Sequence, residues 1–559
     1  MTAKRLSMVA LLAVLLFDVW WRSHTIAGTV RETFGFAPWP VVAQAEPLDC
    51  DEAIYAYIGK RLVAGDVMYR DLTENKPPLG YWLFALAVRI GGASETCIRL
   101  MPVPMVLATI ALVWWIAGRL AGPLGAAIAA WIYALMSTDP YLYGNGANLE
   151  HAINLFGAAA LALMVLAWPG KSRWPLFAAG VCVGAASLVK QVAIAPLLVF
   201  AFSLFLRQST PRSALSRVRD VAALLAGFSA SWAMAVSVLV LQGAGRAAFE
   251  DIVRYGGALA TVTPRDPKEY PFFVRWLVGN TDPNGLLPWP FGATRGRAWW
   301  AAGSWPIWAV SVPSLIWSGL ANRGERRLVA AWTLAAWVAV ALPGLFWQHY
   351  YLVPLPGVAV LVAVTFADSL RAIVSRPRLS RAWIPGVASF LIFAAVLASF
   401  RIQIRDYLLV EPIKITERYK GGGQWVVLRE IGLELGRRTR SWTSPHLFVW
   451  GIQSPLYLYS GLDGVTPQVF ADPLITAFSE RDAPLVRPRI DRTMRDLRTR
   501  RPDLIFVGQR PFPALLGFLR EHYLHTDLVV RGTALPLPPD GSGLWVRRDR
   551  FREYERPAD

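Results

Sequence analysis

Charged side chains are scarce in this chain of 559 residues, of which only 17% are Asp, Glu, Lys or Arg. Hydrophobic residues make up 54%, tryptophan occurs 25 times, and the mean hydropathy is +0.37. A soluble globular protein has about one quarter charged residues, so the deficit argues against a soluble protein. The composition predicts a protein that crosses a membrane many times.

Cysteine is also rare. The chain has three cysteines and no CxxC pair or Cys/His cluster, which argues against a structural zinc site. Cys182 lies in an apolar stretch, where packing explains it. Cys50 and Cys97 both fall in a segment predicted to lie outside the cytoplasm. They either pair as a disulfide, if that compartment is oxidising, or remain two thiols.

Positive charge is in excess, with a net charge of +18. A basic chain can indicate a nucleic-acid partner, but here most Lys and Arg residues lie in short loops between hydrophobic runs. That distribution is typical of the cytoplasmic loops of a membrane protein and not of a nucleic-acid surface. The sequence therefore predicts a lipid bilayer, and no nucleic acid, as its environment.

Eleven apolar stretches approach the roughly 20 residues that a transmembrane helix needs. With Lys4 and Arg5 in the cytoplasm, the other basic loops fall on the same side, and only Lys190 breaks the pattern. The first stretch can also be read as a signal peptide, but "AQA" at 43–45 lies far beyond it, which favours a retained helix. The stretches are 7–22, 98–118, 120–138, 151–168, 174–189, 191–206, 221–241, 298–319, 328–347, 351–367 and 383–400.

This orientation places three long segments outside the cytoplasm, at 23–97, 242–297 and 401–559. In the last of them, short strand-like runs such as "HLFVW" and "DLIFVG" alternate with helical patterns. The predicted organisation is a mainly α-helical, polytopic membrane domain over 1–400 and an extracytoplasmic α/β domain over 401–559. "GGG" at 421–423 follows no strand and is interpreted as a linker.

The first external segment holds the stretch with the most chemistry, "LDCDEAIYAYIGKRLVAGDVMYRDLTENKPPLGYW" (48–82). Asp51 and Glu52 stand near the start of a predicted short helix, where an acid is favoured as a cap. The alternative is that a carboxylate there accepts a proton from a hydroxyl or holds a cation. Lys76 precedes two prolines that stiffen the backbone, so it either binds a lipid phosphate or is an ordinary interfacial lysine.

Four stretches, in this order, resemble the membrane-embedded GT-C glycosyltransferases. Among these the sequence is most similar to the protein O-mannosyltransferase and aminoarabinose transferase superfamily, which is glycosyltransferase family 39-like. The resemblance covers roughly residues 45–400 and implies a GT-C fold with about eleven transmembrane helices. The stretches are Asp51-Glu52 with "KPPLGYW" (76–82), "GNGANLEHAINLFGAAALAL" (144–163), "GVCVGAASLVKQVA" (180–193) and "FWQHYYLVPLPGVAVL" (346–361).

The resemblance also implies roles for individual residues. Asp51 matches the family's general base or cation ligand, and Glu52 matches its supporting partner. Lys76 matches the residue that contacts the lipid phosphate. The other matching positions are His349 and Tyr350 near the donor phosphate, Lys190 and Gln191 at a helix end, and Asn148, Glu150 and His151 in the second external loop.

The loop 242–297 is expected to fold over the site, and Arg275 within it can add a phosphate contact. Lys190 is also a candidate on physical grounds, since an ionisable residue at a membrane helix end marks a functional site unless it reaches outward to the surface. No cofactor is expected with certainty, although Asp51 could hold a divalent cation. The sequence does not select the sugar or the acceptor.

The expected activity is inverting transfer of a sugar from a polyprenyl-phosphate carrier to a hydroxyl of a protein, glycolipid or polysaccharide. The expected location is the bacterial inner membrane, with a cytoplasmic N-terminus and an extracytoplasmic C-terminal domain. Basic residues would neutralise the phosphate and a carboxylate would accept the proton of the acceptor. Two alternatives remain: a lipid-carrier flippase or transporter, and a non-catalytic relative in envelope assembly.

Overall fold

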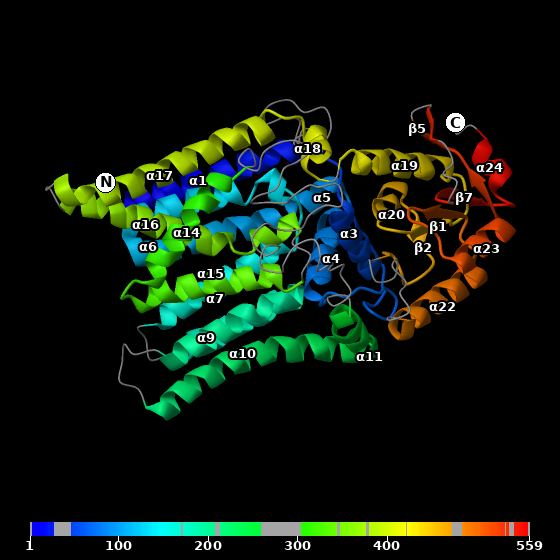
Figure 1. The fold of residues 1–559 in the computed structure, drawn as a ribbon. Coiled ribbons are helices and arrows are strands. Elements are labelled where there is room, and N and C mark those ends of the chain that lie inside the picture. The colour runs from blue at the N-terminus through cyan, green and yellow to red at the C-terminus, as the bar shows by residue number, and fades with distance from the viewer. Residues whose placement is uncertain are drawn as a thin grey trace, which may run out of the picture. The chain divides into compact units, whose positions relative to one another are not determined.

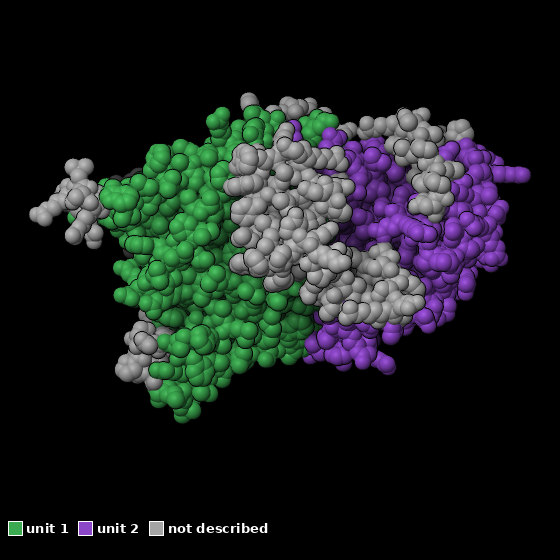
Figure 2. Space-filling view, in the orientation of Figure 1, with its two compact units in different colours: residues 1–46, 99–235, 266–415 green, residues 47–98, 236–265, 416–559 purple. Residues whose placement is uncertain are grey.

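Figure 1 shows the computed structural model of the protein. The structure describes residues 3–26, 46–168, 172–206, 213–258, 303–343, 347–375, 379–420, 422–471, 483–530, 533–535 and 541–556. The chain forms two compact units, coloured green and purple in Figure 2. Unit 1 comprises residues 1–46, 99–235 and 266–415, and unit 2 comprises residues 47–98, 236–265 and 416–559.

Unit 1 is built from long apolar helices. In α6, Gly122 has a φ of 76° and precedes Pro123, so a kink divides this long element into two helical stretches. The helices are α1 (Ala3–Ser23), α6 (Pro102–Met136), α7 (Glu150–Ala167), α8 (Trp174–Val189), α9 (Ala195–Leu206), α10 (Ala214–Leu241), α14 (Trp305–Gly319), α15 (Gly324–Ala341), α16 (Leu355–Ser375) and α17 (Leu379–Gln403), with the short turns η1 (His24–Ile26), η2 (Pro140–Leu142), η3 (Gln191–Ile194), η6 (Gln348–Leu352) and η7 (Ile404–Leu408).

Each of the eleven predicted spans contains helix in the described residues. By length and composition, six described stretches can cross a membrane, and α8 and the η3–α9 stretch are shorter apolar helices. The six stretches are Arg5–Ile26, Glu95–Met136, Glu150–Ala167, Ala214–Leu241, Leu355–Ser375 and Trp383–Leu408. The prediction of a multi-pass, mainly α-helical membrane protein is therefore confirmed.

Helices α8 and α10 approach each other through small residues. A Cβ atom on Gly180 would lie 1.9 Å from the carbonyl oxygen of Leu224, and one on Gly227 would lie 1.9 Å from that of Phe177. One turn further along, a Cβ atom on Gly184 would lie 2.6 Å from the Cβ of Ser231. Backbones pack this closely in membranes because small residues allow extensive van der Waals contact.

Unit 2 contains a five-stranded mixed sheet in the order β2-β1-β3-β7-β4. Strand β1 (His446–Trp450) is parallel to β2 (Asp463–Gly464) and to β3 (Leu504–Val507), and it pairs Phe448 with Ile505. Strand β7 (Gly543–Arg547) is antiparallel to both β3 and β4 (Tyr523–Thr526). Strands β5 (Leu528–Val530) and β6 (Thr533–Leu535) form a separate hairpin. The predicted C-terminal α/β region is therefore confirmed.

Helices α22 (Ala483–Arg500) and α23 (Pro513–His522) supply apolar side chains to the core of this sheet, among them Val486 and Phe518. The other helices of the unit come from three separate parts of the chain. They are α3 (Cys50–Val63), α4 (Leu79–Gly91), α11 (Gly245–Phe249), the π-helical turn η4 (Glu250–Tyr255), α19 (Gln424–Arg438), α20 (Pro455–Ser460) and α24 (Phe551–Glu555). The chain passes between the units in α5 (Glu95–Leu100), α10 and α18 (Pro412–Tyr419).

Helix α3 packs on α20 within unit 2. The rings of Tyr57 and Tyr457 stack with centroids 4.5 Å apart, and the Tyr57 hydroxyl accepts a hydrogen bond of 2.6 Å from the Gly464 amide. The Ser454 hydroxyl donates to the carbonyl of Cys50 at 3.0 Å. The first external segment is thus anchored on the C-terminal α/β region. Cys50 and Cys97 are both free thiols, so the disulfide alternative is not what the structure shows.

Candidate functional site

The candidate residues fall into two groups, one in each unit. The first group is at the start of α3. Asp49 is the N-cap of this helix: its side chain accepts from the Glu52 amide at 3.0 Å, and the Glu52 carboxylate accepts from the Asp49 amide at 3.1 Å. This reciprocal pair is a capping box, and it shows that Asp49, not Asp51, caps the helix. Glu52 is fully buried in this role.

Asp51 occupies the first turn of α3 and is half-buried. It therefore stands at the positive end of a helix beside two other carboxyl groups, those of Asp49 and Glu52. Burial, and then the neighbouring charge of Glu52, raise the pKa of Asp49 to about 7, although Lys420 opposes this shift. The start of α3 thus gathers three carboxyl groups, and the pKa of one of them, Asp49, is raised.

Lys76 lies in a fixed position after the loop that follows α3. Its ammonium nitrogen is 3.5 Å from a carboxylate oxygen of Glu74 and 5.3 Å from the centre of the Tyr55 ring, which belongs to α3. The Tyr69 hydroxyl donates to the Lys76 carbonyl at 2.7 Å. The lysine side chain is 24% exposed, so a ligand can reach it. Its partner Glu74 was not among the residues selected from the sequence.

The second group lies in unit 1, where α7 begins and α8 ends. Lys190 and Glu150 form an ion pair, and the Lys190 ammonium is 4.4 Å from the centre of the Tyr350 ring. Both charged side chains are buried, with Lys190 8% and Glu150 1% exposed. The alternative in which Lys190 simply reaches outward to the surface does not fit this pairing.

His349 joins the same group through aromatic contacts. Its ring is 4.7 Å from that of Tyr350 in an edge-to-face arrangement and 6.2 Å from that of Tyr143. The side-chain amide of Asn148 donates to the carbonyl of Tyr143 at 2.7 Å. The structure therefore brings together Lys190, Glu150, Tyr350 and His349, with Asn148 fixing the loop that carries Tyr143.

His151 has a different environment. Its Nε2 lies 3.0 Å from the carbonyl oxygen of Gly144, which also accepts a hydrogen bond of 2.9 Å from Arg22. Arg22 further contacts Asp18 at 3.0 Å. His151 is completely buried in this network, and its visible role is to hold the loop between η2 and α7.

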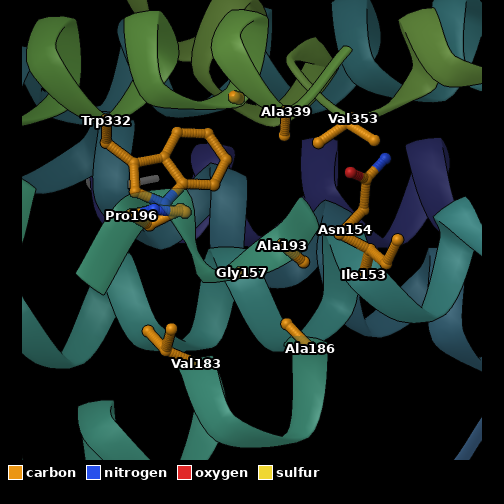
Figure 3. Close-up of a pocket in the computed structure, with 11 residues that line it drawn as sticks. Ile153, Asn154, Gly157, Val183, Ala186, Ala193, Pro196, Trp332, Ala339 and Val353 are labelled. Carbon is orange, nitrogen blue, oxygen red and sulfur yellow. The ribbon is translucent and has the colours of Figure 1, made fainter. Parts of the chain in front are cut away.

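An apolar cavity lies in unit 1, and some of its lining residues are close in sequence to the second group (Figure 3). Its lining includes Asn154, one helical turn after Glu150, and Val353, which follows Tyr350 closely in the chain. Trp332 and Asn154 face this space from different helices. The remaining lining residues are Ile153, Gly157, Val183, Ala186, Ala193, Pro196, Ala336 and Ala339.

The structure does not test two of the predictions, the phosphate contact of Arg275 and a cation at Asp51. Arg275 lies outside the described residues. Among the residues that the structure describes, no group of three or more His, Cys, Asp or Glu side chains could hold a metal ion. Asp51 as a cation ligand therefore stays a prediction.

Sequence reasoning missed Asp49, Glu74 and the buried pair Asp251–Arg489 of unit 2. Asp49 had a signal, because Asp49-x-x-Glu52 has the spacing of a capping box before an apolar helix. Glu74 stands two residues before Lys76, but no role was predicted for it. Asp251 and Arg489 are far apart in the sequence, and no motif connects them.

Comparisons with known proteins bear on the fold. The family model for dolichyl-phosphate-mannose-protein mannosyltransferase matches residues 75–237. No curated protein matches the sequence. Among solved structures, ArnT from Cupriavidus metallidurans in the apo state is 14% identical with a TM-score of 0.53, and the match covers 97% of this chain and 98% of that chain.

ArnT bound to undecaprenyl phosphate is 17% identical with a TM-score of 0.50, over 96% of this chain and 97% of that chain. The archaeal oligosaccharyltransferase AglB from Archaeoglobus fulgidus, in complex with an inhibitory peptide and a dolichol-phosphate, is 12% identical with a TM-score of 0.53. That match covers 90% of this chain and 69% of AglB. The chain therefore shares the GT-C fold of these solved structures, and residues 75–237 are similar to the mannosyltransferase family.

Proposed function

We propose that this protein transfers a glycosyl group from a polyprenyl-phosphate-linked sugar to a hydroxyl acceptor at the extracytoplasmic face of the bacterial inner membrane. The observation that carries the proposal is the family match over residues 75–237. This range includes Lys76 and the buried Lys190–Glu150 pair, two fixed cationic positions in a protein with the GT-C fold.

The two lysines suit the leaving group of this reaction. When the bond between the anomeric carbon and the phosphate oxygen breaks, the phosphate takes up the bonding electrons and gains negative charge. Cations that are already in place stabilise this charge without reorganisation. Lys76 is held between Glu74 and Tyr55, and Lys190 between Glu150 and Tyr350. The resemblance assigns phosphate binding to Lys76 in unit 2 and to Lys190, His349 and Tyr350 in unit 1.

Asp51 is the proposed general base. The acceptor oxygen attacks the anomeric carbon as the phosphate leaves from the opposite side, so the configuration inverts. The acceptor proton passes to the Asp51 carboxylate. Asp51 is a candidate for this role because its carboxylate stands, only half-buried, in the first turn of α3. Glu52 supports it by holding the first turn of α3.

The relatives support a lipid-phosphate donor but do not select a sugar. ArnT was solved with undecaprenyl phosphate, and AglB with a dolichol-phosphate and a peptide. An acceptor on a protein or on a glycolipid is compatible with the proposal. Asn148, Glu150 and His151 are proposed to shape the substrate side of the unit 1 group.

Transfer of radiolabel from a panel of polyprenyl-phosphate sugars tests the proposal. Membranes containing wild-type protein, Asp51→Asn or Asp549→Asn are compared, because Asp549 has a side chain that is 66% exposed and serves as a matched control. We expect transfer by wild type and Asp549→Asn, and a loss of about a hundredfold or more in Asp51→Asn. Full transfer by folded Asp51→Asn would refute the assignment of the base.

The same assay separates the alternatives. Label that moves across the membrane while remaining on the lipid carrier would identify a flippase. Absence of both transfer and movement, for every carrier in the panel, would favour the non-catalytic relative.

A further inference from the structure

The segment of residues 66–78, here called the lysine loop, carries Lys76 and is held by two other parts of unit 2. One is the region of α11 and η4, and the other is the C-terminal α/β region. Within the loop, Tyr69 adopts a φ of 69°, and its amide donates to the Leu72 carbonyl at 2.8 Å. A non-glycine residue in this conformation needs a surrounding structure that enforces it.

Asp251 makes the central contact from η4. Its carboxylate pairs with the guanidinium of Arg489 on α22 and lies close to the Glu74 backbone, which acts against the rise in the pKa of Asp251. The Arg489 guanidinium also lies 3.7 Å from the centre of the Tyr255 ring. Asp251 is 6% exposed, and this burial raises its pKa to about 6, against the opposing effect of Arg489. A buried carboxylate with two such partners has a defined position.

The C-terminal region adds contacts on either side of this point. The Thr73 amide donates to the Pro467 carbonyl at 2.9 Å, and the Thr73 hydroxyl donates to the Gln468 side chain at 3.0 Å. Arg492, on α22 with Arg489, donates to the Arg70 carbonyl at 3.0 Å. The backbone of the lysine loop is therefore held at Arg70 and at Thr73.

These contacts determine where Lys76 can be. Glu74 follows Thr73 in the chain and lies close to Asp251, and its carboxylate is the ion-pair partner of Lys76. On the other side, Pro77 and Pro78 restrict the backbone and lead into α4. A change at Arg489 therefore acts on Asp251, which lies next to the residue that pairs with Lys76.

We propose that Asp251 and Arg489 are positioning residues for the donor, and that α22 of the C-terminal region orients Lys76 through them. This inference rests on the proposed function, because it assumes that Lys76 binds the lipid phosphate. Neither residue needs to touch the substrate. The C-terminal α/β region is then part of the donor site's construction and not only an appended domain.

Steady-state kinetics and hydrogen exchange together test the proposal. The variants are Arg489→Ala, Asp251→Asn, the double variant, and Arg498→Ala, which removes the same charge from an exposed position of the same helix. We expect KM for a polyprenyl-phosphate sugar to rise about tenfold in Arg489→Ala and in Asp251→Asn, with kcat changed less than threefold. The double variant should resemble either single variant, because both remove one contact.

Hydrogen exchange measures the lysine loop without relying on activity. Amides of residues 66–78 should exchange faster in Arg489→Ala than in wild type, whereas Arg498→Ala should match wild type. If active Arg489→Ala keeps both the wild-type KM and the wild-type exchange, the positioning role is refuted while the proposed function stands. If wild type transfers no sugar, the proposed function fails. Binding of undecaprenyl phosphate by wild type and Arg489→Ala then decides the positioning role: equal affinity refutes it, and weaker binding by the variant with faster loop exchange supports it.

Discussion

Lys190 and Glu150 pair inside unit 1 at two helix ends of opposite polarity. Glu150 is the first residue of α7, where the helix dipole favours a negative charge, and Lys190 directly follows the last residue of α8, where it favours a positive one. The pair is therefore stabilised by its own helices as well as by mutual attraction. In the proposed function, a phosphate that approaches Lys190 must compete with Glu150 for the ammonium group.

The Lys190–Glu150 pair should show strong coupling in stability. Lys190→Met leaves a buried carboxylate without its cation, and Glu150→Gln leaves a buried ammonium, so each should destabilise by about 3 kcal/mol or more. The double variant should recover most of that loss. Thermal unfolding in detergent measures all three proteins. Additive losses in the double variant would show that the two side chains do not depend on each other.

Lys76 should act mainly on donor binding. A hydrogen bond to a charged group contributes about 1.5–3 kcal/mol, so Lys76→Ala should raise KM for the donor about tenfold to a hundredfold. Lys76→Arg should keep part of the affinity, since the charge remains but its shape changes. Lys60→Ala is the matched control, because Lys60 pairs with Asp463 at the surface of the same unit. An unchanged KM in folded Lys76→Ala would contradict the role.

Asp49 should make stability depend on pH. Its pKa in the folded protein is about 7, above the value of about 3.9 for an unfolded chain, so the folded state binds the proton more tightly. The contribution of this group to stability is therefore greatest below pH 4 and is lost as the pH rises to 7. Asp49→Asn keeps a side-chain oxygen for the cap and removes the charge.

Melting temperatures in detergent at pH 5 and pH 8 measure this effect. The fall in Tm between the two values should be smaller in Asp49→Asn than in wild type. Asp491→Asn, which changes an exposed carboxylate of the same unit, should behave as wild type. An equal fall in all three proteins would show that Asp49 does not carry the pH dependence.

The contact of α8 and α10 should not tolerate even one methyl group. Gly227→Ala places its Cβ against the Phe177 carbonyl, so the helices must separate and Tm should fall by several degrees. Gly386→Ala in α17 adds the same group with no atom within 4 Å, and should be neutral or slightly stabilising. A similar Tm for both variants would contradict the close crossing.

The helices of unit 1 could be predicted from the sequence. Apolar runs such as 174–189 coincide with a helix in the structure. Helix α8 ends directly before Lys190, and a helix end was predicted at this charged residue. The resemblance selected Lys190, Glu150, His349 and Tyr350, and the structure brings these four side chains together.

The contacts of the lysine loop were not predictable in the same way. Asp251 pairs with a residue 238 positions away, and neither side chain stands in a periodic or motif-like context. Such pairs depend on how separate segments fold together, which local propensity does not encode. The capping box at Asp49 and Glu52 is the opposite case: its spacing is visible in the sequence, but the predicted cap was Asp51, whereas the structure assigns it to Asp49.

Unit 2 has a consequence for biosynthesis. Its first segment, residues 47–98, is made before most of unit 1, but Thr73 bonds to Pro467, which is synthesised 394 residues later. The α3–α4 segment must therefore wait, with its contact surfaces uncovered, until the ribosome has finished nearly the whole chain. The α3–α4 segment is made early and gains its C-terminal partners late, so a premature stop before α20 leaves it without them.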